Sequence, residues 1–372
     1  MVYLDHNASS PLDTAVLEAM LPYLGKFHGN PSSLHRLGRI GRSAIDAARG
    51  QVAALVGAEP SQVIFTSGGT EANNLSLKGL AGKLPRGTLA IGATEHPSVS
   101  APAERLRLQG WELHTLTVDG DGQLAKGNWA SLPMANLRFA SLMLANNETG
   151  VIQEVSALAD WMRGCGGYLH CDAVQAAGKL PVDFASLGAH LLTLSSHKIH
   201  GPKGAGALIL EKTVELEPLL EGGGQERDLR SGTENVAAIV GFGKAAELAL
   251  AGLESRRAHL LALRHRLESG LAGLPGIRIF AQHAPRLPNT VQFGLSGMDG
   301  EALLMALDRK GFAVSSGSAC ASGAGQPSPV LLAMGVDAET AKSAIRVSLG
   351  KDNSAAEVDA FLAALPTIAQ RD

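Results

Sequence analysis

The 372-residue sequence is poor in cysteine and aromatic residues and has almost no net charge. Its three cysteines are too few for a disulfide framework, and no two have the Cys-x-x-Cys spacing of a zinc or redox motif. A charge sum of −3 gives no electrostatic reason to expect nucleic acid or an anionic membrane surface as a partner. These features favour a protein of a reducing compartment, and we expect it to be cytoplasmic.

The sequence also lacks an uninterrupted long apolar run. The nearest candidate, residues 236–253, carries Lys244 and Glu247 near its centre, which favours a buried or amphipathic helix over a membrane span. The first seven residues contain neither a basic nor an apolar stretch, so we expect no signal peptide. With 45% hydrophobic and 18% charged residues, the composition excludes global disorder.

Short β-type runs alternate with helical periodicity through the first 230 or so residues. This alternation predicts a mostly parallel sheet covered by helices on both faces. The expected strands are 63–65, 88–91, 113–118, 139–144, 168–171, 191–194 and 207–210. The expected helices are 37–56, 70–80, 98–109, 155–163 and 173–177.

The pattern changes after residue 233. One long helical stretch, 235–271, leads into a second α/β unit. That unit has expected strands near 277–280, 290–293 and 345–349 and an expected helix over 300–310. A length of 372 residues suggests two domains at about 150 residues each, and we place the boundary near residue 255.

The clearest chemical signal is Lys198, which lies beyond an apolar strand and before a glycine-rich turn in residues 195–204. A lysine in this place can be desolvated enough to react as a neutral amine, as a Schiff-base lysine must. Most lysines are exposed to solvent, so Lys198 taken alone reads as an ordinary loop residue. Its companions in the sequence favour chemistry instead.

The first companion is Asp172, at the end of a predicted buried strand. A carboxylate there suits the protonated pyridine nitrogen of pyridoxal phosphate, because the pair keeps the ring cationic and able to accept electrons. Gln175 can reach the same ring if both residues lie on one helical turn. A helix N-cap is the alternative role for Asp172.

A glycine turn in residues 66–73, centred on Gly69 and Thr70, joins a strand to a helix. Its exposed amides, its hydroxyls and the positive end of the helix dipole suit a phosphate group. The spacing matches neither a nucleotide P-loop nor a Rossmann turn. The signal is therefore weak unless a phosphate cofactor is already indicated.

Two more polar residues, His96 and Asn147, fall in short loops after predicted strands. Open α/β sheets bind ligands at the carboxyl ends of their strands, where these loops should lie. An imidazole can stack on a heteroaromatic ring, and an amide can hold a carboxylate. An ordinary loop histidine and a turn asparagine are the alternatives for each taken singly.

Of the three cysteines, Cys320 lies in a run of small residues, 315–325, which we expect to be an exposed, mobile loop with an accessible thiol. We expect Cys165 and Cys171 to be inert residues of the core. A metal site is not predicted, because the candidate ligands match no standard zinc spacing. Those candidates are His170, Cys171, His197 and His200.

Nine segments spread over nearly the whole chain resemble those of cysteine desulfurases, in particular the NifS/IscS-like branch with a long active-site cysteine loop. They are residues 3–11, 29–33, 65–71, 146–150, 196–204, 222–227, 230–233, 315–320 and 346–350. The resemblance implies the aspartate-aminotransferase-like α/β fold, fold type I of pyridoxal-phosphate enzymes. It implies a large domain of residues 16–254 with a mostly parallel central sheet, and a smaller α/β domain of residues 1–15 and 255–372 that carries the cysteine loop.

The resemblance also implies a role for each matching residue. Lys198 would form the Schiff base and act in catalysis with His96, and Cys320 would take the sulfur as a persulfide. Asn147 and Arg346 would bind the substrate carboxylate. The residues expected to hold pyridoxal phosphate are Lys198, Asp172, Gln175, His96, Gly69, Thr70, Ser195, His197 and, from a neighbouring subunit, Thr233.

The activity implied by the resemblance is conversion of L-cysteine to L-alanine by a homodimer, with sulfur passed to acceptor proteins of iron–sulfur cluster assembly or transfer-RNA thiolation. The alternatives are a selenocysteine lyase, a class V aminotransferase, or a sulfur-relay platform with little catalysis. A transaminase needs no thiol, so Cys320 counts against that reading. Lys198, Asp172, His96 and Arg346 count against the platform.

Overall fold

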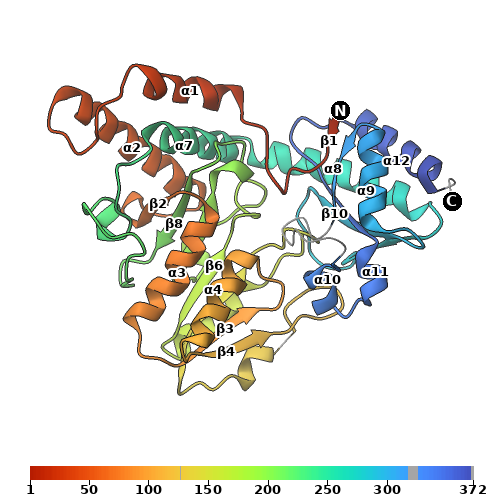
Figure 1. The fold of residues 1–372 in the computed structure, drawn as a ribbon, viewed down its shortest axis with the longest axis horizontal. Helices are drawn as coiled ribbons and strands as arrows, with labels where there is room; N and C mark the ends of the chain where they lie inside the picture. The colour runs from red at the N-terminus through yellow and green to blue at the C-terminus, as the bar shows by residue number, and fades with distance from the viewer. Residues whose placement is uncertain (126, 317–325, 370–372) are drawn as a thin grey trace.

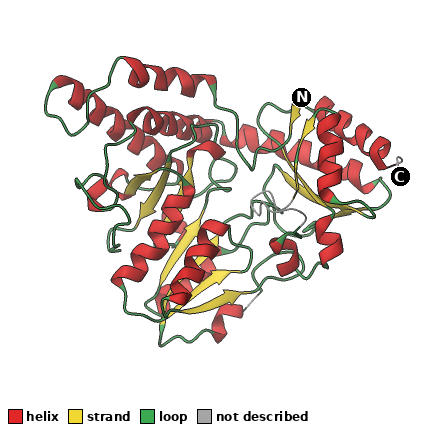
Figure 2. Cartoon of the chain, in the orientation of Figure 1, coloured by secondary structure: helices red, strands yellow, loops and turns green. Residues whose placement is uncertain are grey.

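The computed structural model describes residues 1–125, 127–316 and 326–369, so Cys320 lies outside the described residues. Figure 1 shows two regions side by side, with the N- and C-termini both in the region that the C-terminal, blue part of the chain forms. The other region is built around the largest sheet. Figure 2 shows helices on both sides of that sheet.

In the described chain the largest sheet has seven strands, in the order β2-β8-β7-β6-β5-β3-β4. Their bounds are β2 Val63–Thr66, β3 Thr88–Gly92, β4 Glu112–Leu116, β5 Leu137–Met143, β6 Tyr168–Asp172, β7 Leu191–Ser195 and β8 Gly206–Leu210. Among the described strands of this sheet, β8 runs antiparallel to both of its neighbours, β2 and β7, and the pairs from β7 to β4 are all parallel. The predicted mostly parallel sheet is confirmed.

Helices cover both faces of this sheet because successive side chains of a strand point to opposite faces. Ile64 and Phe139 pack with α3 and α4, whereas their neighbours Phe65 and Ala140 pack with α2, α5 and α7. The helices of this region are α1 Thr14–Gly25, α2 Arg36–Leu55, α3 Gly69–Lys83, α4 Pro97–Leu108, α5 Val155–Gly164, α6 Phe184–Leu187 and α7 Val236–Ala251. Burial on both faces explains the nearly continuous apolar runs of the central strands.

The predicted single helix over residues 235–271 is wrong. The chain forms α7 Val236–Ala251 and α8 Leu253–Ala272, which meet at a bend of 72°. The guanidinium of Arg256 donates to two of the last carbonyl groups of α7, so α7 ends there with its carbonyls satisfied. The bend carries the chain from the apolar cluster of the large sheet to that of the second sheet. The predicted domain boundary at residue 255, close to this bend, stays a prediction.

The predicted short helix over residues 173–177 is also wrong. The N–H groups of Ala176 and Ala177 both bond to the carbonyl of Ala173, which closes a single turn. The chain then enters Gly178 at φ +74°, a left-handed conformation that a helix cannot continue.

The C-terminal region contains a four-stranded antiparallel sheet in the order β12-β13-β10-β9, counted over described residues. Leu263, Phe293, Leu307 and Phe361 are among the residues that form its core. A separate parallel pair joins β1 Val2–Tyr3 to β11 Phe312–Ala313, so the N-terminal segment lies with the C-terminal part of the chain. The remaining elements are β9 Ile277–Ile279, β10 Thr290–Leu295, α9 Gly300–Arg309, β12 Ser315–Ser316, α10 Pro329–Ala333, α11 Ala338–Lys342, β13 Ala344–Ser348 and α12 Ala355–Ala369.

Among the described helices, none is by itself both long and apolar enough to cross a membrane. The pair α7 and α8 meets those two criteria only when the helices are taken together across their bend.

Close packing of α7 on α2 depends on a glycine, which gives a test of the core. An alanine at Gly243 would place its Cβ 2.6 Å from the Cα of Ala48, so Gly243→Ala should lower the free energy of unfolding by about 1–3 kcal/mol. Gly50 in α2 has open space around its Cα, and Gly50→Ala should raise that free energy by about 0.5–1 kcal/mol. The urea unfolding midpoints of the two variants measure both changes. A Gly243→Ala protein as stable as the wild type would contradict the packing.

Candidate active site

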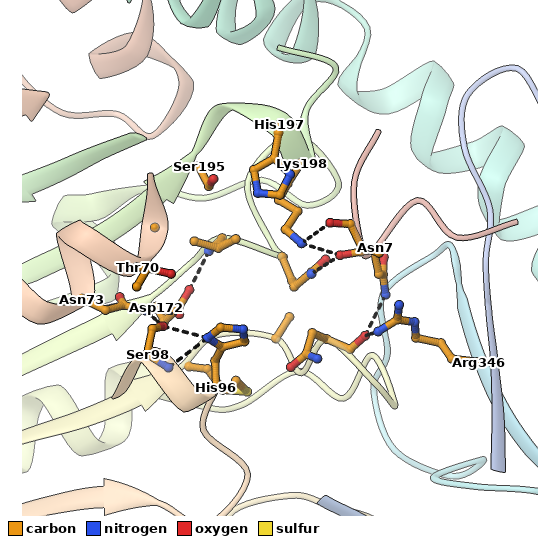
Figure 3. A pocket seen from close by; sticks show the side chains of 17 residues that line it. Asn7, Thr70, Asn73, His96, Ser98, Asp172, Ser195, His197, Lys198 and Arg346 are labelled. Carbon is orange, nitrogen blue, oxygen red and sulfur yellow. Dashed lines mark hydrogen bonds between the residues drawn. The ribbon is translucent and has the colours of Figure 1, made fainter. Parts of the chain in front are cut away.

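A cavity of about 310 Å³ lies where β5, β6 and β7 end. Met143, Asp172 and Ser195 bring the ends of these strands to its wall. The start of α3, the start of α4, the N-terminal segment and β13 supply further lining residues, and Figure 3 shows their side chains converging on one space. The carboxyl ends of parallel strands are where open α/β sheets bind ligands.

Most of the predicted site residues meet in this cavity. Those that line it are Gly69, Thr70, His96, Asn147, Asp172, Gln175, Ser195, His197, Lys198 and Arg346. Thr233 is exposed and does not line the cavity, and Cys320 lies outside the described residues.

Asp172 forms one end of the site. Its side chain is 6% exposed, and Oδ2 accepts a hydrogen bond from Asn73 Nδ2 at 2.7 Å. Oδ1 accepts from the N–H of Val174 at 2.9 Å. The carboxylate therefore caps the turn after β6. The alternative role given to Asp172 was the N-cap of a helix, and here it caps a turn instead. The carboxylate also lines the cavity. These two hydrogen bonds hold it in place without using all of its acceptor capacity.

Burial shifts the pKa values of two titratable groups near Asp172, Glu95 and His170. Burial, together with the charge of Asp172, raises the pKa of Glu95 to about 8, although a hydrogen bond from the N–H of Met143 opposes the shift. Burial lowers the pKa of His170 to about 4. His170 lies between the hydroxyls of Ser141 and Thr193. Neither Glu95 nor His170 brings a second charge beside Asp172.

Lys198 follows β7 directly, in the 3-10 turn η3 Ser196–Lys198. Its Nζ donates to the carbonyl oxygens of Asn7 at 2.6 Å and Ala8 at 2.8 Å, so the N-terminal segment holds the amine in the cavity. Burial lowers the pKa of His197 to about 4, with the charges of Lys198 and Lys203 adding to the shift. The imidazole next to Lys198 is therefore neutral at neutral pH.

His96 faces the same space from the start of α4. Its Nδ1 accepts from the N–H of Ser98 at 3.1 Å and lies 2.7 Å from the Ser98 hydroxyl. Burial is the largest cause of its lowered pKa, against the opposing charge of Asp172. Figure 3 shows the His96 ring below the space between Asp172 and Lys198.

The glycine turn forms a third wall. Gly69 and Thr70 begin α3, which directs the positive end of a 15-residue helix at the cavity. A Cβ at Gly69 would lie 2.9 Å from Cγ2 of Val174, so close approach of the backbone requires glycine there. Ser195 Oγ is buried and has no hydrogen-bond partner among the described residues. A helix N-terminus beside a partnerless hydroxyl is a suitable place for an anion.

Arg346 of β13 forms the opposite end of the cavity and is 3% exposed. One terminal nitrogen donates to Asp5 Oδ1 at 2.6 Å, and the other donates to the carbonyl of Asn147 at 3.1 Å. Its Nε is buried without a partner in the described chain. The guanidinium is thus aimed by the N-terminal segment and by the loop that carries Asn147.

Sequence reasoning gave no role to Asn7, which is 1% exposed and has the most partners at the site. Its side-chain nitrogen donates to Thr290 Oγ1 and to the carbonyl of Asn147. Its carbonyl accepts from Lys198 and Gln175. Asn7 belongs to the N-terminal segment that carried part of the resemblance. Its neighbours in the sequence form no pattern that would indicate hydrogen-bond partners in distant parts of the chain.

Three other residues near the cavity were not singled out either. Asn73 lies one helical turn beyond Thr70 on α3, a spacing that places it on the same face and gives a usable signal. Lys179 is almost completely buried and donates to Asn7 Oδ1 and Gln175 Oε1. Glu95 precedes His96 directly and points away from the cavity lining, towards the backbone of Met143.

The two described cysteines differ from each other. Cys171 is fully buried, and burial raises the pKa of its thiol well above the usual value, which confirms its assignment to the core. The same prediction for Cys165 is wrong, because Cys165 is only partly buried. It caps the C-terminus of α5, where the chain has left the apolar face of that helix. Within the described residues, no three His, Cys, Asp or Glu side chains gather as metal ligands would.

Comparison with known proteins identifies the family. The Aminotransferase class-V family matches residues 2–361. A cysteine desulfurase from Cereibacter sphaeroides is 46% identical over 371 residues, which are 99% of this chain and 95% of that protein. A solved NifS-like protein superposes with a TM-score of 0.93 at 36% identity, with 99% of both chains covered. A second structure, SspA in complex with cysteine, gives a TM-score of 0.83 at 30% identity, with 94% of this chain and 99% of the other covered. The chain therefore belongs to the class-V aminotransferases, among the pyridoxal-phosphate-dependent cysteine desulfurases.

Proposed function

We propose that this protein transfers the sulfur of L-cysteine to the thiol of Cys320, which yields L-alanine and a persulfide on Cys320. The observation that carries the proposal is that Lys198, Asp172 and Arg346 line one cavity. They are an amine for a Schiff base, a carboxylate for a ring nitrogen and a guanidinium for a substrate carboxylate. Cysteine as the substrate is supported by the SspA relative, which was solved in complex with cysteine.

The residues of the cavity fit pyridoxal phosphate. The start of α3 and the partnerless Ser195 hydroxyl suit its phosphate, and Asp172 suits its ring nitrogen. Lys198 Nζ suits its aldehyde carbon, and the neutral imidazole of His96 suits the face of its ring. When bound, this cofactor accepts the electrons that substrate bonds release.

The chain's own groups then divide the work. Arg346 and Asn147 hold the substrate carboxylate, which orients the Cα–H bond. Lys198, kept in the cavity by the carbonyls of Asn7 and Ala8, takes the proton from Cα. The thiolate of Cys320 attacks Sγ of the substrate, the Cβ–Sγ bond breaks, and its electron pair stays with the carbon fragment. Protonation of Cβ and return of a proton to Cα complete L-alanine, so one cysteine and one thiol give one alanine and one persulfide.

Lys198→Ala tests the role of the amine. The variant should still bind the cofactor without a covalent bond, but its rate of alanine formation from L-cysteine should fall about 100-fold or more, because the amine proposed to move the Cα proton is lost. Alanine and sulfide assays measure the change. Lys203→Ala, which removes an exposed lysine of the same segment, is the control and should retain turnover. Normal turnover by Lys198→Ala would refute the assignment.

Cys320→Ser tests the acceptor thiol. The variant should bind cofactor and substrate as the wild type does, yet form no persulfide and little alanine, because a hydroxyl is a poor nucleophile towards sulfur. Mass spectrometry of the cysteine-treated protein locates the added sulfur. Cys165→Ser removes a partly buried thiol outside the cavity and should leave the persulfide intact. Sulfur found on Cys165 or Cys171, or full activity of Cys320→Ser, would favour a lyase or a transaminase instead.

We further propose a homodimer in which Thr233 of each subunit reaches the phosphate site of the other. The exposure of Thr233 and its absence from the cavity of its own chain support this arrangement, as does the prevalence of two-fold symmetry among homo-oligomers. We propose that the dimer works in the cytoplasm, where a reducing environment keeps thiols free, and passes sulfur to acceptor proteins of cluster assembly or transfer-RNA thiolation.

A mixing experiment tests the shared site. A heterodimer of one Lys198→Ala subunit and one Thr233→Ala subunit contains one site with both native residues, so it should recover about half of the wild-type activity. The activity of heterodimers isolated with two affinity tags measures this recovery. Each variant alone, taken through the same exchange, is the control. Verified heterodimers without recovered activity would show that Thr233 serves its own subunit, and full activity of the Thr233→Ala protein alone would show that it serves neither site.

A further inference from the structure

A second lysine, Lys179, lies behind the catalytic one. Its side chain is buried, with 6% of the residue exposed. Its Nζ donates to Gln175 Oε1 at 2.7 Å and to Asn7 Oδ1 at 2.9 Å. Both acceptors are neutral amides, so a buried basic group is held here without a carboxylate in contact. Burying such a group costs folding free energy. Its presence here therefore points to a role other than stability.

The contacts of Lys179 fix the orientation of Gln175. The other end of the Gln175 amide lies 2.9 Å from the carbonyl of Asn7, which can only accept, so that end must be the NH₂ group. The oxygen of Gln175 is thereby turned towards Lys179, which donates to it. Without Lys179 this buried oxygen would have no hydrogen-bond donor. Rotation of the amide away from this position would then lower the free energy. Gln175 also lines the main cavity, so its orientation decides whether the cavity meets a donor or an acceptor.

Lys179 and Lys198 are also linked through one residue. Lys198 contacts the carbonyl of Asn7, and Lys179 contacts the side-chain oxygen of the same asparagine. Burial first, and then the charges of Lys198 and Arg346, hold the pKa of Lys179 well below its usual value. A neighbouring basic group is one of the known means of keeping a reactive lysine neutral.

The other titratable groups around Lys179 do not replace it in this role. A smaller cavity of about 30 Å³ lies beside it, and no described Asp or Glu side chain lines that cavity. Burial lowers the pKa of His6 to about 4, so this neighbour is neutral. Asp172 lines the main cavity, and Asp5 is paired with Arg346. The basic or imidazole groups that line the smaller cavity with Lys179 are His6, Lys198, His200, Arg256 and Lys351.

We propose that Lys179 is a positioning residue of the active site: it turns the NH₂ group of Gln175 away from itself, towards Asn7 and the cavity, and it favours the neutral form of the Lys198 amine. The inference rests on the proposed function, because the group that Gln175 and Lys198 meet in the cavity is pyridoxal phosphate. When the cofactor is bound, both effects would act in one direction on the protonation of the Lys198 nitrogen. A hydrogen-bond donor near the cofactor and a protonated amine near Lys198 would each make a proton on that nitrogen easier to lose.

The measurement is the pH titration of the cofactor's absorption band in the purified holoprotein. Lys179→Met keeps the length and apolar stem of the side chain and removes the amine, so the pH midpoint of the band should rise by about one unit. Lys212→Met is the matched control, because exposed Lys212 pairs with Glu59 and neither residue lines the cavity, so it should leave the midpoint unchanged. Thermal unfolding of each variant separates loss of stability from the shift.

The outcomes separate this inference from the function on which it rests. The wild-type protein should show an absorption band that Lys198→Ala abolishes. If it shows no such band, the proposed function and the inference are overturned together. A band that is present but keeps its midpoint in a folded Lys179→Met protein would overturn only the inference, even if the unfolding temperature falls. If Lys179→Met does not fold, Lys179→Gln carries the same test, since it restores a donor to Gln175 without a charge and should raise the midpoint by a smaller amount. An unchanged midpoint in a folded Lys179→Gln protein would then overturn the inference.

Discussion

The hydrogen bonds of Asn7 are the constraint on which the site depends. Every polar atom of this residue has a partner: its N–H donates to Ser348 Oγ at 2.9 Å, and its side-chain oxygen accepts from Lys179 and Asn289. Its other partners, described above, include Lys198 and Thr290. A segment near the N-terminus thus joins β10 and β13 of the second sheet to the strand ends of the first. Because a buried polar atom left without a partner costs about 1–3 kcal/mol, these contacts favour one arrangement of the two sheets.

The same packing also determines which groups around the cavity are charged. Burial keeps Glu95 protonated and keeps His170 and His197 neutral at neutral pH. What remains along the cavity wall is a carboxylate at the Asp172 end and basic groups at the other. In a site shielded from water such a separation creates a directional field, so a ligand with a cationic end and an anionic end has one favourable orientation.

The sequence was sufficient for the parts of this structure that depend on local pattern. The alternation of strands and helices predicted the sheet, and the positions of Asp172 and Lys198 at strand ends predicted that they would meet. The contacts of Asn7 and Lys179 were beyond reach, because their partners are set by how distant segments pack. The bend at Gly252 and the turn after Asp172 were missed for another reason. In both places the sequence continues a helical pattern of apolar and small residues. In the structure, a glycine and a capping side chain end the helical conformation there.

The pairing of Arg346 with Asp5 bears on how the cavity attracts an anionic substrate. Arg346 is the residue best placed to hold a carboxylate, yet its charge is already balanced by Asp5 at 2.6 Å. The ion pair can orient a carboxylate through the remaining N–H groups, but its net charge is zero, so it draws an anion only weakly over a distance. Lys198 Nζ, with Lys179 behind it, is a further basic group at this cavity. The Arg346–Asp5 pair therefore contributes more to the orientation of a substrate carboxylate than to its attraction over a distance.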